Sequence, residues 1–280
     1  MNNYDLKGRV IAITGATGGL GRAAAQALRG RGAKLALLDL DLEVLDKQAA
    51  TLGKPDEVAG WVADVRSLDS LETALAAVAQ HFGGVDVVVA AAGVATQESM
   101  ESMSPEVFER TIDINLNGVW RTFRAALPHV RKRQGYLLAV SSMAAFVHSP
   151  LNSHYCASKA GVWAMCDSIR LELAQLRVGV GSLHPTFFMT PMMDAALQGR
   201  CSALVWNNHQ GLWKLVSLEQ VVAALVDCIE RRRDTVTVPG SNSLVAKAPG
   251  LLRRIIERIG FDPDRVAKAV REQANLQEAG

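Results

Sequence analysis

The fold is decided by the stretch Thr14–Gly21, which reads TGATGGLG. It follows an apolar run, Arg9–Thr14, that is typical of a buried strand, and it opens a segment with helical spacing of apolar residues from about Leu20 to Gly30. Glycine permits a sharp turn and a close approach of phosphate to the backbone, while a helix N-terminus offers N–H groups and partial positive charge. A glycine-rich turn alone is a weak signal. In this strand–turn–helix context it predicts a dinucleotide site.

The same alternation of strand and helix continues along the chain. Further strands are predicted at Lys34–Asp39, Val58–Ala63, Val85–Ala90, Tyr136–Ser141, Val178–Leu183 and Thr235–Val238. Helices are predicted at Leu42–Leu52, from Ser67 or Asp69 to about His81, at Pro105–Arg133, Tyr155–Leu176 and Ser217–Arg231. Such alternation requires right-handed crossovers and a parallel sheet covered on both faces. We therefore predict an α/β fold, a three-layer doubly wound (Rossmann) sheet of about seven strands, with ligands at the carboxyl ends of the strands.

Length and composition fit one large core. The chain has 280 residues, of which 49% are hydrophobic and 5% aromatic. We expect one domain over residues 1–240 and a C-terminal helical extension over residues 241–280, packed on the same domain or on a partner subunit. The net charge of +2 gives no reason to expect nucleic acid as a partner.

The cysteines and the N-terminus bear on the compartment. Cys156, Cys166, Cys201 and Cys228 are scattered without a CxxC pair, which predicts neither a metal site nor a disulfide framework. The N-terminus lacks the apolar core of a secretory signal, and no apolar stretch is long enough to span a bilayer. We expect a soluble, cytoplasmic protein with reduced thiols.

Two acidic residues end the second and third predicted strands, on the adenosine side of the expected site. Asp39 can accept hydrogen bonds from ribose hydroxyls, and its charge would repel a 2′-phosphate. No Arg or Lys lies inside the glycine loop or directly after Asp39, where Leu40 stands, so NAD(H) is favoured and NADP(H) is the alternative. A second interpretation is that Asp39 only caps the next helix together with Asp41. Asp64 can bind the adenine amino group or equally cap a helix.

The candidate reacting groups are Tyr155, Lys159 and Ser142. Tyr155 and Lys159 stand four residues apart on a predicted helix, so their side chains share one face. A phenol is a poor base at neutral pH, but a neighbouring ammonium and a positively charged nicotinamide would lower its pKa. Tyr155 would then exchange a proton with an alcohol or ketone while hydride moves to or from the cofactor. Ser142, at the end of the preceding strand, is placed to hold the substrate oxygen.

Together these residues resemble the short-chain dehydrogenase/reductases in their compact single-domain form, over about residues 5–240. The shared motifs are the TGxxxGxG loop, the YxxxK pair of Tyr155 and Lys159, the serine thirteen positions earlier (Ser142) and the NxxG segment that begins at Asn115. The resemblance implies that Tyr155 is the acid/base, that Lys159 also binds the nicotinamide ribose and that Ser142 orients the carbonyl. It further implies that Asn115 lies in a helix opened by a bound water of the proton relay.

The resemblance also implies a set of cofactor contacts, in which Thr190 matches the family's threonine at the carboxamide. The expected contacts are Gly15, Thr17, Gly18, Gly19, Leu20, Gly21, Asp39, Asp64, Val65, Ala91, Gly93, Tyr155, Lys159, Pro185 and Thr190. Two departures from the family pattern stand out. The stretch Ala90–Gly93 reads AAAG where the family has NNAG, which bears on local stability and cofactor affinity. Thr186 follows Pro185 where the family has glycine, which bears on how the nicotinamide is held.

In this family substrate choice lies in the segment after the sixth strand, here about Phe187–Trp213. Its side chains are mostly apolar or aromatic, which is typical of an apolar pocket. The residues expected to line this pocket are Phe146, His148, Phe187, Phe188, Met192, Trp206 and Trp213. The alternative is that part of this set is ordinary core or interface. The pocket predicts a hydrophobic secondary alcohol or ketone, such as a steroid, terpenoid, long-chain or aromatic compound.

The C-terminal extension has an amphipathic pattern. Leu244–Ile259 has apolar residues at helical spacing with Lys and Arg between them, and a second helix is predicted at Pro263–Leu276. A basic amphipathic helix can lie on an anionic membrane, but more often it packs on its own domain or on a partner subunit. The resemblance implies a homodimer or homotetramer that pairs through the helices in Pro105–Arg133 and Tyr155–Leu176.

These features predict an NAD(H)-dependent oxidoreductase that acts on CH–OH groups. One alternative is a non-catalytic dinucleotide-binding regulator on the same scaffold, and another is an enzyme for a different redox step, such as epimerisation or dehydration. A regulator has no need for Asn115, Ser142, Tyr155 and Lys159 together, so their joint presence favours an enzyme.

Overall fold

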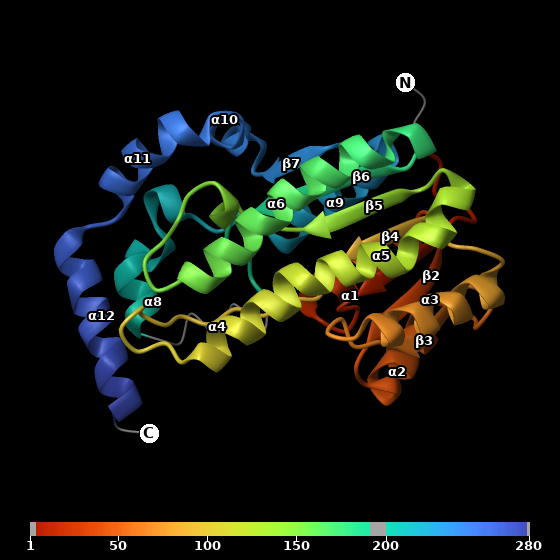
Figure 1. Ribbon diagram of the computed structural model, residues 1–280, viewed down its shortest axis with the longest axis horizontal. Coiled ribbons are helices and arrows are strands. Elements are labelled where there is room, and N and C mark those ends of the chain that lie inside the picture. The colour runs from red at the N-terminus through yellow and green to blue at the C-terminus, as the bar shows by residue number, and fades with distance from the viewer. Residues whose placement is uncertain (1–3, 191–199, 279–280) are drawn as a thin grey trace.

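Seven parallel strands form the sheet at the centre of the computed structural model, which describes residues 4–190 and 200–278 (Figure 1). The strands are β1 (Val10–Thr14), β2 (Lys34–Asp39), β3 (Val58–Val62), β4 (Val87–Ala90), β5 (Tyr136–Val140), β6 (Gly179–Pro185) and β7 (Thr235–Val238). Their order is β3-β2-β1-β4-β5-β6-β7, so the chain reverses its direction of winding between β1 and β4. The predicted doubly wound sheet is confirmed.

Helices connect the strands, and several of them have a side-chain cap at the N-terminus. The described helices are, in chain order, α1 (Gly19–Arg29), α2 (Leu42–Leu52), α3 (Leu68–Phe82), α4 (Pro105–Ile112), α5 (Gly118–Val130), α6 (Ser153–Leu173), α8 (Arg200–Val205), α9 (Leu218–Arg231), α10 (Ser243–Lys247), α11 (Pro249–Gly260) and α12 (Pro263–Glu278). Asp41, Ser67, Ser104 and Ser217 accept hydrogen bonds from backbone N–H groups at the starts of α2, α3, α4 and α9. Such caps satisfy donors that the helix itself leaves open.

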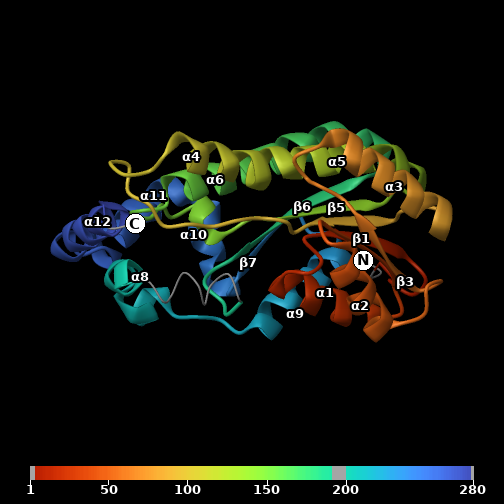
Figure 2. The same cartoon turned by 90° about the horizontal axis from the view of Figure 1, so that it is seen from below.

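Side chains alternate between the two faces of each strand and build two apolar layers. On one face, residues such as Ala12, Leu38 and Leu137 pack with α3, α5 and α6. On the other face, residues such as Ile13 and Leu138 pack with α1, α2 and α9. Figure 2 shows the sheet between these two helical layers. Because both faces are covered, the strands are apolar on both sides, which explains why they read as continuous hydrophobic runs.

Two helices predicted as continuous are interrupted. The predicted helix Pro105–Arg133 contains a π-helical turn, Asp113–Asn117, between α4 and α5. The prediction of a single helix over Leu244–Ile259 is wrong, because α10 ends before Ala248 and α11 begins at Pro249. A proline has no N–H for the helical ladder and disfavours helical backbone in the residue before it, so it separates the two helices.

The C-terminal extension packs on its own chain. It leaves β7 through α10 and α11, and α12 lies against α8 at the end of the molecule farthest from β3 (Figures 1 and 2). The outer side of α11 leaves Leu251, Ile255 and Ile259 exposed, and contact of this side with a membrane stays a prediction. Within residues 4–190 and 200–278, every helix is too short or too polar to cross a bilayer.

The connection between β6 and α9 begins and ends at neighbouring positions beside the sheet. The N–H of Thr186 donates to the carbonyl oxygen of Val238 (2.8 Å), at the end of β7. The N–H of Val216 donates to the carbonyl oxygen of Phe187 (2.9 Å), and Phe188 and Val216 form an isolated parallel bridge. The two ends of this long connection are therefore hydrogen-bonded together beside the sheet.

Candidate active site

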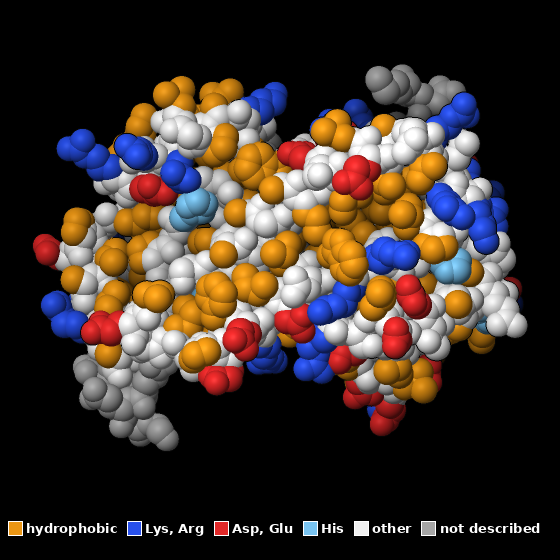
Figure 3. Space-filling view, in the orientation of Figure 1, with side chains coloured by type: hydrophobic (Ala, Val, Ile, Leu, Met, Phe, Trp, Pro, Cys, Tyr) orange, Lys and Arg blue, Asp and Glu red, His pale blue; other side chains and the backbone are white. Residues whose placement is uncertain are grey.

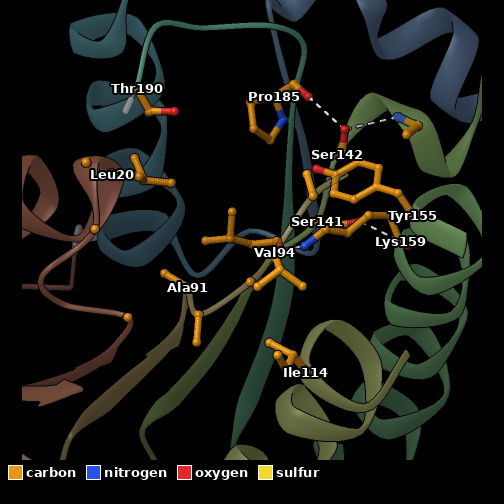
Figure 4. Close-up of a pocket in the computed structure, with 18 of the residues that line it drawn as sticks. Leu20, Ala91, Val94, Ile114, Ser141, Ser142, Tyr155, Lys159, Pro185 and Thr190 are labelled. Atoms are coloured by element: carbon orange, nitrogen blue, oxygen red, sulfur yellow. Dashed lines mark hydrogen bonds between the residues drawn. The ribbon is translucent and has the colours of Figure 1, made fainter. Parts of the chain in front are cut away.

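A cavity of about 690 Å³ lies at the carboxyl ends of the strands. Its lining includes Gly15 after β1, Ala91 after β4, Ser142 after β5 and Pro185 at the end of β6. It therefore spans the place between β1 and β4 where the strand order reverses, which is where open α/β sheets bind their ligands. Figure 4 shows residues from these strand ends facing one cavity.

The glycine loop is packed so closely that two of its glycines have no room for a side chain. Gly15 has a φ of +67°, and a Cβ built on it would lie 2.7 Å from the Cα atom of Ala92. A Cβ on Gly21 would lie 2.2 Å from the carbonyl oxygen of Gly15. Gly18 differs, since its Cβ would lie 3.4 Å from the same oxygen. The loop therefore lies against the start of α1 and the end of β4, with its remaining surface turned to the cavity.

The N-terminus of α1 is open to a ligand. Gly18 is its N-cap, no side chain caps this end, and the first turn has no acidic residue. The N–H of Arg22 donates to the carbonyl oxygen of Gly18 (2.9 Å), so the N–H groups before Arg22 lie outside the helical ladder. These donors and the helix dipole suit a pyrophosphate, so the residues present fit a dinucleotide.

Asp39 lies at the edge of the cavity and is held by the glycine loop. Its Oδ2 atom accepts hydrogen bonds from the N–H of Thr17 (2.9 Å) and from the Thr17 hydroxyl (2.6 Å). Its Oδ1 atom accepts from the N–H of Leu40 (2.9 Å). The next helix is capped by Asp41 alone, so the interpretation of Asp39 as a cap shared with Asp41 is wrong.

Asp64 also lines the cavity, together with an arginine that the sequence analysis did not select. The guanidinium of Arg66 donates to Oδ2 of Asp64 (2.6 Å), and its Nε atom donates to Oδ1 (3.0 Å). This pair holds the pKa of the Asp64 carboxyl below its ordinary value. The N-cap of α3 is Ser67, so Asp64 does not serve as the helix cap.

Tyr155, Ser142 and Lys159 come together on the β5–α6 side of the cavity (Figure 4). The Tyr155 hydroxyl lies beside Ser142, whose hydroxyl donates to the carbonyl oxygen of Pro185 (3.5 Å) and accepts from the N–H of Ala144 (3.2 Å). Lys159 Nζ donates to the carbonyl oxygen of Val140 (2.9 Å) and lies 5.6 Å from the centroid of the Tyr155 ring. The predicted shared helix face and the predicted position of Ser142 are thus seen in the structure.

In the structure, burial raises the pKa of Tyr155 to about 12, and the Ser142 hydroxyl offsets part of that rise. The lowering expected from a bound, positively charged nicotinamide stays a prediction. The ammonium of Lys159 lies over the ring and is directed to Val140, and burial lowers the pKa of Lys159 to about 8. Tyr155 is therefore a protonated phenol at neutral pH. A protonated hydroxyl beside Ser142 can donate a proton to a carbonyl oxygen.

Asn115 lies behind the cavity in the π-helical turn. Its side chain is fully buried, and its Oδ1 atom accepts from the N–H of Val94 (2.8 Å). Its Nδ2 atom donates to the carbonyl oxygen of Val94 (2.8 Å) and to Ser158 Oγ (3.3 Å). A Cβ on Gly93 would lie 3.2 Å from Asn115 Oδ1, so the small residue permits this approach. Asn115 thus fixes the loop after β4 and does not itself line the cavity among the described residues.

His184, which the sequence analysis missed, supports Ser142 from inside the sheet. The ring is fully buried in β6, its Nδ1 atom lies 3.2 Å from the carbonyl oxygen of Ser142, and its Nε2 atom lies 2.8 Å from Ser182 Oγ. Burial lowers the pKa of His184 to about 4, so the ring is neutral at physiological pH. The available signal was two polar residues spaced by two in an apolar strand, which places both on one face.

All the residues expected to contact the cofactor line this one cavity. They are Gly15, Thr17, Gly18, Gly19, Leu20, Gly21, Asp39, Asp64, Val65, Ala91, Gly93, Tyr155, Lys159, Pro185 and Thr190. The AAAG departure leaves the loop well packed, because Ala92 lies directly against Gly15 and the N–H of Ala91 is 3.3 Å from the Thr14 hydroxyl.

Only some of the residues expected to line the substrate pocket are found in the lining of the cavity. Phe187, Phe188, Trp206 and Trp213 line the cavity. Phe146 does not, because its ring is buried against Trp163 and His184. His148 is exposed and also lies outside the lining, and Met192 lies outside the described residues. Met143, Ser149 and Asn152, which the sequence did not single out, also line this side.

Comparison with known proteins gives one consistent family. A family model described as short chain dehydrogenase matches residues 9–200. A (-)-trans-carveol dehydrogenase from Rhodococcus erythropolis is 37% identical over 205 residues, which cover 68% of this chain and 74% of that protein. A D-beta-hydroxybutyrate dehydrogenase from Rhizobium meliloti is 31% identical over 230 residues, which cover 77% of this chain and 89% of that protein.

Similar solved structures agree with the sequence relatives. A crystal structure described as a short-chain dehydrogenase/reductase, glucose/ribitol dehydrogenase, from Brucella melitensis has a TM-score of 0.75 and 31% sequence identity. The match covers 85% of this chain and 97% of that chain. The match to the family model ends at residue 200, so the C-terminal extension lies outside it.

Proposed function

The chain belongs to the short-chain dehydrogenase/reductase family, and we propose that it transfers hydride between a nicotinamide dinucleotide and an apolar secondary alcohol or its ketone. The observation that carries this proposal is that Tyr155 and Ser142 line the same cavity as the glycine loop. A protein that only bound a dinucleotide would need the loop, but it would not need a phenol and a serine directed at a second ligand.

Each side chain has a stated role in this proposal. Ser142 hydrogen-bonds the substrate oxygen, and Tyr155 donates a proton to that oxygen in reduction and accepts it in oxidation. Lys159 holds the nicotinamide ribose and contributes positive charge beside the phenol. Asn115 keeps the loop after β4 in place, and Thr190 contacts the carboxamide. When bound, the nicotinamide supplies the hydride donor or acceptor.

We assign NAD(H) as the preferred cofactor because of Asp39. Its carboxylate lies at the cavity edge and is fixed by Thr17 and Leu40, so a 2′-phosphate would meet a negative charge. Arg66 also lines the cavity, but Asp64 already engages its guanidinium. The test is the dissociation constants of NADH and NADPH for the native protein and for Asp39→Ala. We expect the native protein to bind NADH at least about tenfold more tightly, and the variant to lose that preference. Tighter NADPH binding by the native protein contradicts the assignment.

We propose an apolar substrate because four aromatic side chains line the substrate side of the cavity. Phe187, Phe188, Trp206 and Trp213 line it. The relative from Rhodococcus erythropolis is named for carveol, a small cyclic alcohol, which agrees with this chemistry. The test is a panel of ketones and alcohols followed by nicotinamide absorbance. Turnover of cyclic or long-chain ketones supports the proposal, and turnover of small polar sugars or hydroxy acids alone contradicts it.

We also propose a homodimer or homotetramer in the cytoplasm. Phe108, Trp120 and Leu171 leave apolar surface exposed on α4, α5 and α6, and Figure 3 shows hydrophobic side chains gathered on this face of the molecule. Exposed apolar surface of this kind is typical of a subunit interface. The four cysteines are buried and unpaired, in keeping with a reducing compartment. Sedimentation equilibrium measures the oligomeric state, and a monomer at micromolar concentration contradicts the first part.

A further inference from the structure

Three aromatic rings form one wall of the substrate side of the cavity. Phe187, Trp206 and Trp213 all line it, and both tryptophans are otherwise buried. The ring centroids of Trp206 and Trp213 lie 5.1 Å apart, and those of Phe187 and Trp206 lie 4.6 Å apart, both edge to face. Edge-to-face pairs hold one another in fixed orientation. We refer to these three residues as the aromatic wall.

The C-terminal extension forms a second layer behind the aromatic wall. Phe261 stacks on Trp213 with a centroid distance of 4.8 Å and an angle of 26°, and it also meets the edge of Trp206 at 5.6 Å. Phe261 is not among the described residues that line the cavity, so it supports the aromatic wall from behind. The indole Nε1 of Trp213 donates to the carbonyl oxygen of Gly260 (3.1 Å), which fixes the ring in its own plane as well.

Gly260 lies directly against Trp213. A Cβ on this residue would lie 2.4 Å from Cζ2 of Trp213. Any side chain at position 260 would therefore displace the indole. Gly250, in the same helix α11, provides a contrast, because its Cβ would have nothing within 4 Å.

The extension is attached to the segment that carries the wall. Helix α12 packs on α8, where Cys201 Sγ donates to the carbonyl oxygen of the fully buried Ala269 (3.5 Å). Arg265 donates to Oδ1 of Asn207 (2.5 Å), one residue after Trp206. The match to the family model ends at residue 200, so the wall's tryptophans and Phe261 lie outside that match.

We propose that helices α11 and α12 set substrate specificity by holding Trp213, through Gly260 and Phe261, as a fixed flat surface for a ring-bearing ketone or alcohol. This rests on the proposed function, which places the reacting oxygen at Ser142 and Tyr155. The ring system of the substrate lies against Trp213 and Phe187, where stacking rewards flat or cyclic groups over short flexible chains. Gly260 and Phe261 are positioning residues, because they act on the substrate only through Trp213.

The experiment compares Gly260→Ala with Gly250→Ala in the full-length protein. We measure reduction of 2-acetylnaphthalene, which carries a flat ring system, and of 2-butanone, which carries none. For Gly260→Ala we expect KM for 2-acetylnaphthalene to rise about tenfold, with kcat within about twofold and KM for 2-butanone unchanged. Gly250→Ala makes the same chemical change in the same helix and should alter neither substrate. Equal effects of Gly260→Ala on both ketones, or no effect on either, overturn the proposal.

A binding measurement separates this inference from the proposed function. Binding of 2-acetylnaphthalene is followed directly by quenching of tryptophan fluorescence, with no turnover required. Weaker binding to Gly260→Ala than to Gly250→Ala, in a protein that reduces no ketone, supports the wall and contradicts the oxidoreductase proposal. Turnover that is equal in both variants supports the oxidoreductase and overturns the role of the wall.

A second variant covers the case in which Gly260→Ala fails to fold. Phe261→Leu removes the stacked ring behind Trp213 without adding bulk. We expect it to raise KM for 2-acetylnaphthalene severalfold and to leave 2-butanone unchanged. If Phe261→Leu is folded and shows no such difference between the two ketones, the extension does not determine specificity.

Discussion

The glycine loop and the aromatic wall are built in opposite ways at the two sides of one cavity. In the loop, backbone packs on backbone, and Gly15 and Gly21 leave no space even for a Cβ. In the wall, Phe187, Trp206 and Trp213 are held by other rings, among them Phe261 from a distant part of the chain. Backbone packing leaves no room for a side chain at these glycines, whereas the position of each ring depends on the side chains that pack against it. Substitutions on the dinucleotide side are therefore expected to disturb the backbone, and those on the substrate side to change the shape of the cavity.

The largest expected effect lies between these two regions, at Tyr155. Removing its hydroxyl in Tyr155→Phe should lower kcat by about 10²- to 10⁴-fold, because the acid/base group is lost. The dissociation constant for the dinucleotide should stay within about threefold, since the loop is unaffected. Steady-state kinetics and fluorescence titration measure the two quantities. Tyr4→Phe is the control, because Tyr4 lies outside the cavity lining and its buried hydroxyl has no hydrogen-bond partner among the described residues.

Full activity of Tyr155→Phe would contradict the assignment of the acid/base. A loss of dinucleotide binding as large as the loss of kcat would break the comparison in another way. It would show that the phenol belongs to the dinucleotide side and not to the boundary between the two regions.

The rigidity of the loop is tested by Gly21→Ala against Gly18→Ala. The added Cβ at position 21 meets a carbonyl oxygen of the backbone, so we expect a loss of about 3 kcal/mol in the free energy of unfolding. At position 18 the nearest atom is 3.4 Å away, and the loss should stay within about 1 kcal/mol. Urea unfolding measures both. If the two variants are equally stable, the loop is not limited by backbone packing.

The fold and the site were predictable to different degrees for the same reason. The strands, the glycine loop and the set of Ser142, Tyr155 and Lys159 follow from motifs of a few neighbouring residues, and the structure brings them together. The support of Trp213 by Phe261 joins residues 48 positions apart, and no local spacing indicates it. Phe146 was misplaced because its position in sequence does not reveal that its ring turns toward Trp163.

Lys159 gives a smaller effect that depends on pH. Burial lowers its folded-state pKa to about 8 from an ordinary value of 10.5, so the folded protein releases this proton before the unfolded chain does. Stability from this residue therefore increases as pH rises from 8 toward 10.5. Over the first 1.5 pH units we expect the free energy of unfolding to rise by about 2 kcal/mol because of Lys159, and Lys159→Met should lack this rise. Urea unfolding gives the free energy of unfolding of both proteins at about pH 8 and pH 9.5. Subtracting the change in the variant from the change in the native protein removes the contribution of other titrating groups. Parallel curves for both proteins would show that the ammonium is not buried at the boundary of the two regions.

The smallest expected effect concerns His184, behind Ser142. Burial lowers its folded-state pKa to about 4 from 6.5, so the unfolded chain binds the proton first as pH falls. Stability from this residue is present above pH 6.5 and decreases as pH falls below it, by about 1 kcal/mol for the first pH unit. His184→Asn should lack this loss between about pH 6.5 and 5.5. If the native protein and the variant lose stability alike, the ring is not held neutral, and the support of Ser142 differs from the structure.

The long connection between β6 and α9 has its two ends hydrogen-bonded together beside β7. The substrate side can therefore be exchanged as a unit. The connection that carries the tryptophans departs after Phe187 and returns at Val216, and these two residues are joined by a backbone hydrogen bond. The C-terminal extension starts from the neighbouring strand end at Val238, whose carbonyl oxygen accepts from Thr186. Because the ends of the insert are already tied together, doubling its length adds only about 0.6 kcal/mol of closure entropy. A related chain could therefore receive both pieces by grafting at one corner of the sheet, with its own phosphate loop left as it is.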